Sequence, residues 1–341
     1  MKSFASYKAS ITASVLILAM AGTAAAQEEL GGQTLIDAAR KEGKLVLYTS
    51  NQIEAEQELV KEFNKRFPDI RVEIVRAPGS RLATRIATEL SANQLSADVI
   101  DMSDRGLVDG IKDAFADYAP PNAADYPEAV KSIPNLWPKS TWGFVLAHNA
   151  AIVPEGPSNW ADLLKPEYKG KVGLVVANSG GSTWTTAMFQ RKELGDDFWQ
   201  KLAGNGVTVY PSGSPLASAL VRGEVAVGAA QSNSVIPLAR DGAPISVSFP
   251  QEGIPITPSA AGLTKAARNP NAGKLYLNWS LSAEGQEAWV KGQGGFSTLP
   301  QAGLPDGAQE GKVKLWLPDP VEYQSVRNAW IAEWNKIYNV Q

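Results

Sequence analysis

Short apolar runs alternate along the chain with longer segments in which apolar residues recur every three or four positions. The short runs are rich in Val, Ile and Leu and predict buried strands, whereas the longer segments predict amphipathic helices. The predicted strands are residues 44–48, 70–74, 98–102, 172–176, 207–210, 225–230 and 245–249. The predicted helices are one that begins after Asn51 and ends before Pro68, then residues 81–90, a segment from Thr183 onward, a short segment ending at Arg240, and residues 273–281, 283–291 and 323–338. This alternation predicts an α/β protein with mostly parallel sheets that carry helices on both faces.

Two further segments predict extended chain that passes between two α/β units. They are residues 137–149 and residues 253–263, and the second is rich in Pro and Thr. Two crossings of this kind predict two lobes with a hinge near His148 and Thr257. The first lobe is expected to comprise residues 27–141 with about 259–300, and the second residues 142–258 with about 301–341.

Polar loops follow five of the predicted strands, at the point where each strand ends and a helix begins. In parallel sheets, ligands bind outside the carboxyl ends of the strands, and free N–H groups at helix N-termini attract anions. Five such loops in two units predict an anion-binding cleft between the lobes. The alternative is that they are ordinary connections with good capping residues. The candidate ligand-binding residues are Ser50, Asn51, Arg81, Ser103, Asp104, Asn178, Ser179, Gly180, Ser182, Thr183, Ser212, Gly213, Ser214, Gln231, Asn233 and Thr257.

Several of these residues have a second interpretation that the sequence leaves open. Arg81 opens a helix and could pair with a carboxylate or phosphate, or it could be a solvated surface residue. Asp104 could hold an amino or hydroxyl group of a ligand, or it could only complement a helix dipole. Ser182 and Ser214 are placed to cap helices. His148 is expected to be structural, because the chain has no second histidine to form a site with it.

Composition excludes several classes of function. The 341 residues include no cysteine and one histidine, so thiolate zinc sites, iron–sulfur clusters and multi-histidine metal sites are excluded. The net charge of −3 gives no basic footprint for nucleic acid. The motifs of a nucleophile elbow, a P-loop and a dinucleotide fold are absent. We therefore expect no cofactor, no resident metal and no enzyme activity. A secreted hydrolase that uses a pair of carboxylates stays open as an alternative.

An ordered set of segments resembles the extracellular solute-binding proteins of ABC importers. In chain order these segments read LVLYTSN, SADVIDMSD, NWADLLKPEYKGKVGL, SGGS, GEVAVGAAQ, FPQEGIP and NWSLSAEGQEAW. The likeness covers nearly the whole chain after residue 26. It is greatest to the group that binds ferric iron, sugar phosphates and 2-aminoethylphosphonate.

The resemblance implies the two-lobed periplasmic binding protein fold, in which each lobe is a mostly parallel sheet flanked by helices and two strands cross the hinge. It also implies a small ligand enclosed between the lobes, delivery to a permease in the inner membrane, and a monomer. Iron-binding members place two adjacent tyrosines at the position that here reads Gln231 to Ser234. No tyrosine pair occurs in this chain, which favours an organic anion such as a phosphonate, a sugar phosphate or a carboxylate. A ferric-iron carrier is the alternative.

The first 26 residues have the pattern of a secretory signal peptide. Lys2 and Lys8 precede an apolar run that is too short for a spanning helix of about 20 residues. Ala24 and Ala26 then fit the small-residue rule for cleavage. The mature protein is therefore expected in the periplasm.

We expect cleavage after Ala26, which would change the net charge from −3 to −5 because Lys2 and Lys8 are removed. N-terminal sequencing of exported protein should begin at Gln27. A mature protein that begins at Met1, or well inside residues 28–44, would contradict this assignment.

Overall fold

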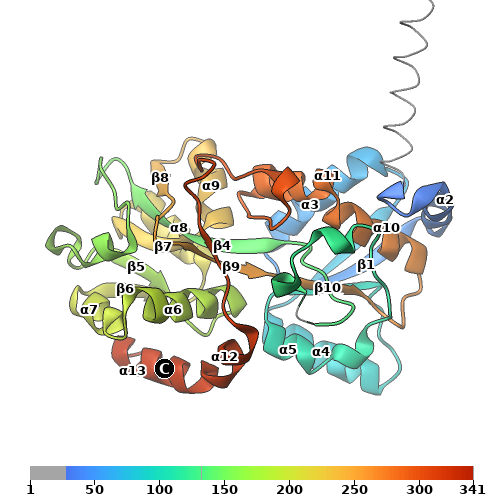
Figure 1. The fold of residues 1–341 in the computed structure, drawn as a ribbon, viewed down its shortest axis with the longest axis horizontal. Coiled ribbons are helices and arrows are strands. Elements are labelled where there is room, and N and C mark those ends of the chain that lie inside the picture. The colour runs from blue at the N-terminus through green and yellow to red at the C-terminus, as the bar shows by residue number, and fades with distance from the viewer. Residues whose placement is uncertain (1–27, 132, 341) are drawn as a thin grey trace, which may run out of the picture.

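Two β-sheets organise the residues that the computed structural model describes, 28–131 and 133–340 (Figure 1). The first sheet has the order β10-β3-β1-β2, in which β10 is antiparallel to β3 and the other pairs are parallel. Its strands are β1 (Lys44–Thr49), β2 (Arg71–Arg76), β3 (Val99–Met102) and β10 (Ala260–Leu263). Its helices are α2 (Gly32–Glu42), α3 (Ile53–Arg66), α4 (Gly79–Ser91), α5 (Arg105–Asp109), α10 (Pro270–Leu281) and α11 (Ala283–Glu287). These elements form the lobe drawn on the right of Figure 1.

The second sheet has the order β11-β9-β4-β7-β5-β6, and β8 also pairs with β4. Its strands are β4 (Thr141–Asn149), β5 (Val172–Val175), β6 (Val207–Tyr210), β7 (Val227–Gln231), β8 (Ile245–Ser248), β9 (Ile254–Pro258) and β11 (Leu315–Trp316). Its helices are α6 (Gly181–Leu194), α7 (Phe198–Gly204), α8 (Gly213–Arg222), α9 (Ser232–Arg240), α12 (Pro320–Ser325) and α13 (Arg327–Tyr338). The α/β fold predicted from the alternating pattern is confirmed.

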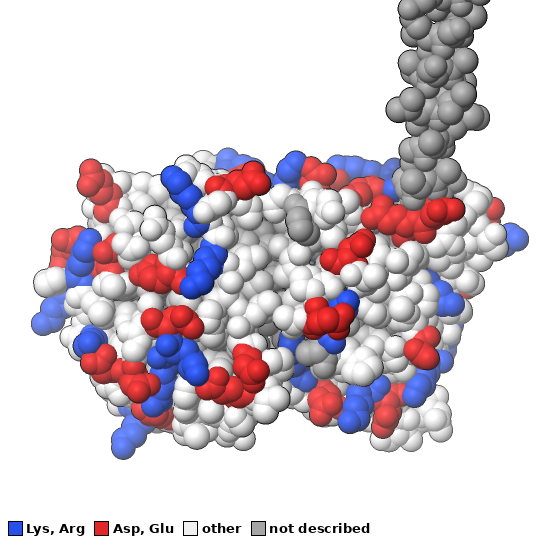
Figure 2. Space-filling model, viewed as in Figure 1, with Lys and Arg blue, Asp and Glu red and all other residues white. Residues whose placement is uncertain are grey.

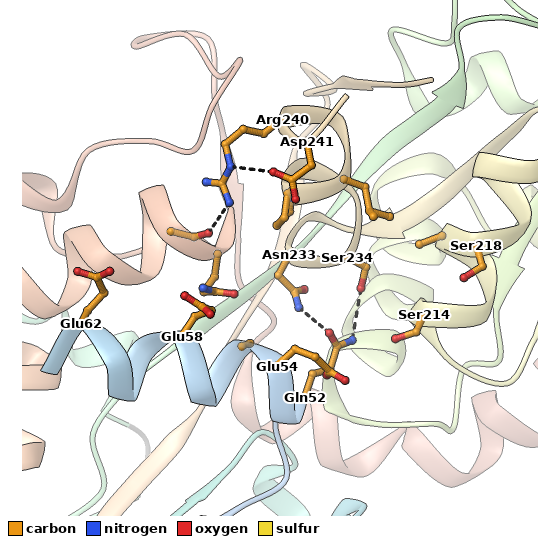
Figure 3. Close-up of a pocket in the computed structure, with 16 residues that line it drawn as sticks. Gln52, Glu54, Glu58, Glu62, Ser214, Ser218, Asn233, Ser234, Arg240 and Asp241 are labelled. Carbon is orange, nitrogen blue, oxygen red and sulfur yellow. Dashed lines mark hydrogen bonds and ion pairs between the residues drawn. The ribbon is translucent and has the colours of Figure 1, made fainter. Parts of the chain in front are cut away.

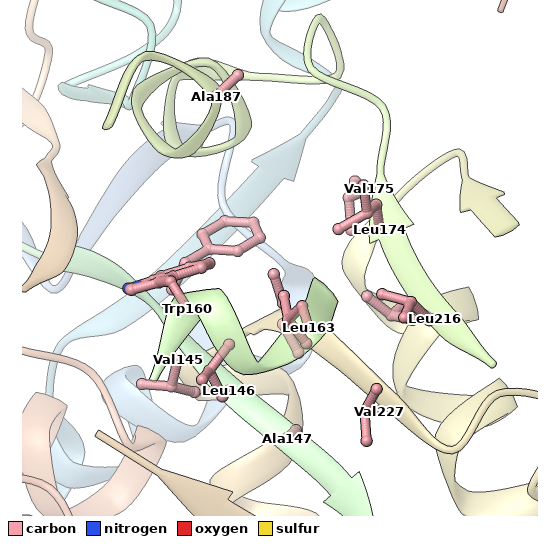
Figure 4. Close-up of a cluster of buried hydrophobic side chains, with 14 of the residues drawn as sticks. Val145, Leu146, Ala147, Trp160, Leu163, Leu174, Val175, Ala187, Leu216 and Val227 are labelled. Carbon is pink, nitrogen blue, oxygen red and sulfur yellow. The ribbon is translucent and has the colours of Figure 1, made fainter. Parts of the chain in front are cut away.

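The core of the second lobe shows why these strands read as continuous apolar runs. Val145, Leu146, Leu174 and Val227 come from three adjacent strands and lie in one buried cluster (Figure 4). The sheet is mixed, with β4 antiparallel to β7 and β9, and β4 is buried at every position, so its middle residues are apolar. Within 28–131 and 133–340, no helix is long and apolar enough to cross a membrane.

The C-terminal segment differs from its prediction as one helix over residues 323–338. It forms α12 and α13, which are separated at Val326. The predicted aromatic face does dock on the second lobe: Trp330 packs edge-on against Trp184 and Trp199, with ring centroids 6.2 Å apart in both pairs. The C-terminus of the described chain therefore belongs to the second lobe.

The two lobes are joined where β4 and β9 pass side by side. Ser140 and Ser259 lie at this crossing, where Ser259 N–H donates to the Ser140 carbonyl at 2.7 Å and Ser140 N–H donates to Ser259 Oγ at 3.1 Å. The prediction that the hinge lies near His148 is wrong, because His148 pairs with Val227 and Ser246 inside the second sheet. The lobe boundaries at 141/142 and 258/259 stay a prediction.

A fully buried ionic cluster lies directly beside the crossing. Lys139 Nζ lies 2.9 Å from Glu56 Oε1 and 3.0 Å from Asp101 Oδ2, and all three side chains are inaccessible to solvent. Burial opposes the charge of Lys139, but the two carboxylates outweigh it and raise the lysine pKa. Burial also raises the pKa of Asp101 more than Lys139 lowers it. The lysine is therefore the cation that makes the two buried acids tolerable.

We expect Lys139→Met to lower the free energy of unfolding by about 3–5 kcal/mol at pH 7, because it leaves two buried carboxylates without a cation. The loss should shrink at lower pH, because the raised pKa of Asp101 lets that buried carboxyl become protonated. Urea denaturation measures both effects. Lys201→Met, at an exposed ion pair, is the control and should change stability by less than about 0.5 kcal/mol. Equal effects of the two substitutions would contradict this role of Lys139.

Candidate functional site

A cavity of about 120 Å³ lies between the lobes, at the carboxyl ends of the strands of both sheets. Its lining comes from the loop after β1, the end of β2, the loop after β3, the starts of α6 and α8, the end of β7, and one residue of β4. The lining residues are Ser50, Asn51, Gln52, Arg76, Ser103, Trp142, Ser179, Gly180, Ser182, Thr183, Ser212, Gly213 and Gln231. Ten of the sixteen candidates from the sequence therefore lie around one cavity.

The start of α6 presents backbone N–H groups to this cavity. Gly180 is the N-cap, and no side chain caps the first turn. Thr183 Oγ1 accepts from Gly180 N–H at 3.1 Å, so this side chain holds the loop. The predicted capping role of Ser182 is wrong because the helix begins at Gly181, two residues earlier than predicted. Ser182 Oγ instead accepts from Gln231 Nε2 at 2.9 Å. Close approach explains Gly181, where a Cβ would lie 2.5 Å from the Ser103 carbonyl of the other lobe.

The start of α8 is built in the same way. Its N-cap is Ser212, whose side chain makes no capping bond. The helix begins at Gly213, so the prediction that Ser214 is the cap is wrong, and Ser214 lies outside the cavity. A Cβ at Gly213 would collide with Gln231 Oε1. Gln231 thus packs between the starts of α6 and α8 and holds the two loops together.

Arg76 is the one charged side chain among the described residues that line the cavity. It ends β2, and its Nε donates to the Asn51 carbonyl at 3.1 Å. Its two amino groups have no protein partner within residues 28–131 and 133–340. The sequence interpretation chose Arg81 instead, but Arg81 is exposed on α4 and does not line the cavity. The strand-end rule that selected the other loops, applied to the strand at 70–74, would have pointed to Arg76.

The expectation that Asp104 holds an amino or hydroxyl group of a ligand is wrong, because other protein groups already occupy its carboxylate. It caps α5 by accepting from Gly106 N–H at 3.1 Å. Its two carboxylate oxygens also accept from Arg327 Nη1 at 2.8 Å and Nη2 at 2.6 Å. This hydrogen bonding raises the pKa of Arg327, so the guanidinium stays charged. Because Arg327 belongs to α13, the ion pair joins the second lobe to the first.

Three other candidates lie away from the cavity. Asn178 is exposed in the loop before α6. Thr257 is buried in β9, where its hydroxyl lies 2.8 Å from Thr185 Oγ1. Asn233 lines a second groove, and its Nδ2 donates to Gln52 Oε1 at 3.2 Å. These positions follow from side-chain direction, which a strand-end pattern does not specify.

The second groove measures about 650 Å³ and runs between α3 and the helices α8 and α9 (Figure 3). Glu54, Glu58 and Glu62 line its α3 side. Gln52 lies between this groove and the inner cavity, because it lines both and its Nε2 donates to Ser234 Oγ at 3.3 Å. In the described part of the chain, no group of three or more acidic or histidine residues could hold a metal ion.

Residues 58–313 match the family described as bacterial extracellular solute-binding protein. An uncharacterized protein of Haemophilus influenzae is 30% identical over 193 residues, 53% of this chain and 55% of that protein. The spermidine/putrescine-binding periplasmic protein of Escherichia coli is 28% identical over 159 residues, 44% of each chain. The chain thus spans about half the length of these first curated relatives.

Solved structures agree on the fold. The periplasmic binding protein AfuA of Actinobacillus pleuropneumoniae, with fructose-6-phosphate bound, is 23% identical with a TM-score of 0.65, over 88% of this chain and 99% of that chain. Iron-bound HitA of Pseudomonas aeruginosa is 19% identical with a TM-score of 0.61, over 87% of this chain and 98% of that chain. The predicted periplasmic binding protein fold is confirmed.

We expect a double-mutant cycle to measure a coupling energy between Asp104 and Arg327, the ion pair that joins the two lobes. Arg327→Gln and Asp104→Asn each break the pair, and Asn keeps the capping function at position 104. The two losses of unfolding free energy should be non-additive, with a coupling of about 0.5–3 kcal/mol in a double-mutant cycle. Strictly additive losses, measured by urea denaturation, would show that the pair contributes nothing to the closed arrangement.

Proposed function

We propose that the protein captures a small polar organic anion between its lobes and delivers it to an ABC permease. The proposal starts from the family to which the chain belongs, the bacterial extracellular solute-binding proteins. The ligand classes considered are phosphonates, sugar phosphates and carboxylates. Membership of a solute-binding family agrees with the expectation that the chain is not an enzyme. Export to the periplasm rests on the signal-peptide pattern, which lies in residues 1–26 and so outside the described residues.

The observation that carries the proposal is the charge of the cavity. Arg76 presents two unpartnered amino groups from the first lobe. The uncapped starts of α6 and α8 present backbone N–H groups from the second lobe. An arginine fork and helix N-termini both favour a carboxylate or phosphate. No acid is among the described residues that line the cavity, and the acids close by, Asp104 and Asp101, are paired with Arg327 and Lys139.

Closure of the lobes follows from where these groups lie. An anion held by Arg76 in one lobe and by the α6 start in the other contacts both lobes at once. It therefore stabilises the closed arrangement, in which Gly181 reaches the Ser103 carbonyl, over an open one. Serine hydroxyls around the cavity supply further donors and acceptors for the rest of the ligand.

Two other ligands are suggested by relatives, and the site supports them less. Ferric iron without cysteine or several histidines needs phenolate ligands, but the end of β7 carries Gln231, and Tyr48 hydrogen-bonds Glu89 away from the cavity. A polyamine needs carboxylates. Those of α3 line the outer groove, where Glu58 and Glu62 are paired with neighbouring lysines.

We expect Arg76→Gln to weaken binding of the tightest ligand by about tenfold to a hundredfold, because a hydrogen bond to a charged group contributes about 1.5–3 kcal/mol. The ligand is first selected by calorimetry from a panel of phosphonates, sugar phosphates and carboxylates. Arg81→Gln is the matched control, because Arg81 does not line the cavity. The Arg81→Gln protein should bind the same ligand with unchanged affinity.

The same panel includes ferric citrate and spermidine. Stoichiometric iron retained after desalting, with a visible charge-transfer band, would contradict the proposal. Spermidine as the tightest ligand would also contradict it. So would an affinity for anions that is the same in Arg76→Gln and in the unaltered protein.

A further inference from the structure

Two residues of the cavity carry buried polar atoms without a protein partner. Asn51 Oδ1 and Trp142 Nε1 make no hydrogen bond, and their side chains belong to residues that are 3% and 4% exposed. Both residues line the cavity between the lobes. Buried polar atoms without a hydrogen-bond partner are uncommon in folded proteins, because each one lowers the stability of the fold. Their presence at a binding cavity indicates that a ligand supplies the missing partners.

The surrounding contacts fix the orientation of both groups. Asn51 Nδ2 donates to Glu56 Oε1 at 2.6 Å and Asp101 Oδ2 at 2.9 Å, so the atom left over is the amide oxygen. The Trp142 ring packs edge-on against Trp289 at 4.9 Å, and Trp289 is itself held by a hydrogen bond to the Thr141 carbonyl. Two residues that line the cavity therefore hold one unpartnered acceptor and one unpartnered donor in restrained side chains.

A hydroxyl group matches this pair, whereas an ammonium group does not. A hydroxyl both donates and accepts, so it can give its proton to Asn51 Oδ1 and accept from Trp142 Nε1. An ammonium group only donates, and it would also need a carboxylate for its charge. The nearby carboxylates already face a cation: Asp104 pairs with Arg327 through both oxygens, and Asp101 pairs with Lys139 through Oδ2, while Asp101 Oδ1 has no hydrogen-bond partner.

The size of the cavity limits the ligand further. Its volume is about 120 Å³, slightly less than the cavity of about 150 Å³ that holds one benzene molecule in another protein. A two- or three-carbon anion fits such a space. A hexose phosphate is larger than this volume and would need the lobes to stand further apart.

We propose, on the basis of the function proposed above, that the ligand is a small anion with a hydroxyl group on its carbon chain and no amino group. Its phosphonate or carboxylate binds Arg76 and the helix starts. Its hydroxyl binds Asn51 Oδ1 and Trp142 Nε1. Phosphonates and carboxylates share this chemistry, and the experiment distinguishes them.

Calorimetry on the full mature protein compares two matched series. The first is 2-hydroxyethylphosphonate, 2-aminoethylphosphonate and propylphosphonate, and the second is 3-hydroxypropionate, β-alanine and butyrate. Within each series only the terminal group changes, from hydroxyl to ammonium to methyl. We expect the hydroxyl compound to bind about tenfold or more tightly than either companion in the series with the correct head group. Fructose 6-phosphate is the size control and should bind more weakly than that compound.

Trp142→Phe removes the indole N–H and keeps an aromatic ring. We expect it to weaken the hydroxyl compound about fivefold and leave the methyl compound unchanged. An unchanged circular-dichroism spectrum and melting profile confirm that the variant folds. Equal losses for both compounds would show that the ring only packs, and would overturn the role of Trp142.

The outcomes separate this inference from the proposed function. If an amino or methyl compound binds more tightly than its hydroxyl companion, or if fructose 6-phosphate binds most tightly, the hydroxyl inference is overturned and the anion function stands. If no anion binds, while iron or spermidine does, the proposed function itself fails and the inference fails with it.

Discussion

The pairing of the two crossing strands between the lobes is the constraint on which the site depends. Ser140 and Ser259 exchange hydrogen bonds where β4 and β9 pass side by side. This crossing sets the two sheets so that the carboxyl ends of their parallel strands face each other. The loops that follow these strands are polar because they begin helices at the surface of each lobe. Bringing the lobes together turns separate surface loops into the lining of one shared cavity.

Charge is distributed so that this cavity favours anions in a protein with a net charge of −3. On the face of the molecule shown in Figure 2, acidic and basic side chains are interspersed over both lobes. Near the cavity, Lys139 and Arg327 pair with the buried and partly buried acids. Arg76 has no such partner. The local field of the cavity is therefore set by one arginine and two helix N-termini rather than by the overall charge.

The sequence predicted the fold well because the pattern of apolar runs is a local property. It also predicted that the loops after β1, β3, β5, β6 and β7 lie together, since parallel strands share one carboxyl edge. Those loops supply most of the residues around the cavity. What the sequence could not specify was the pairing of distant charges. Arg327 neutralises Asp104 from a position 223 residues later in the chain, and no local pattern relates the two.

The errors at Arg81, Ser182 and Ser214 have a different origin. Each depended on where a helix begins, and α4, α6 and α8 all begin earlier than expected, at glycine. A shift of one or two residues rotates a side chain by roughly 100–200° around the helix axis. Trp142 was missed because its strand was assigned only a structural role as a crossing.

The identity of the ligand that the protein carries when purified tests the central claim most directly. Mass spectrometry of small molecules released by denaturing freshly exported protein should find an organic anion in about one-to-one ratio. That anion should be much depleted from the Arg76→Gln protein purified in parallel. A metal ion or a polyamine released in that ratio, present equally in both proteins, would contradict an anion site built on Arg76 and the helix starts.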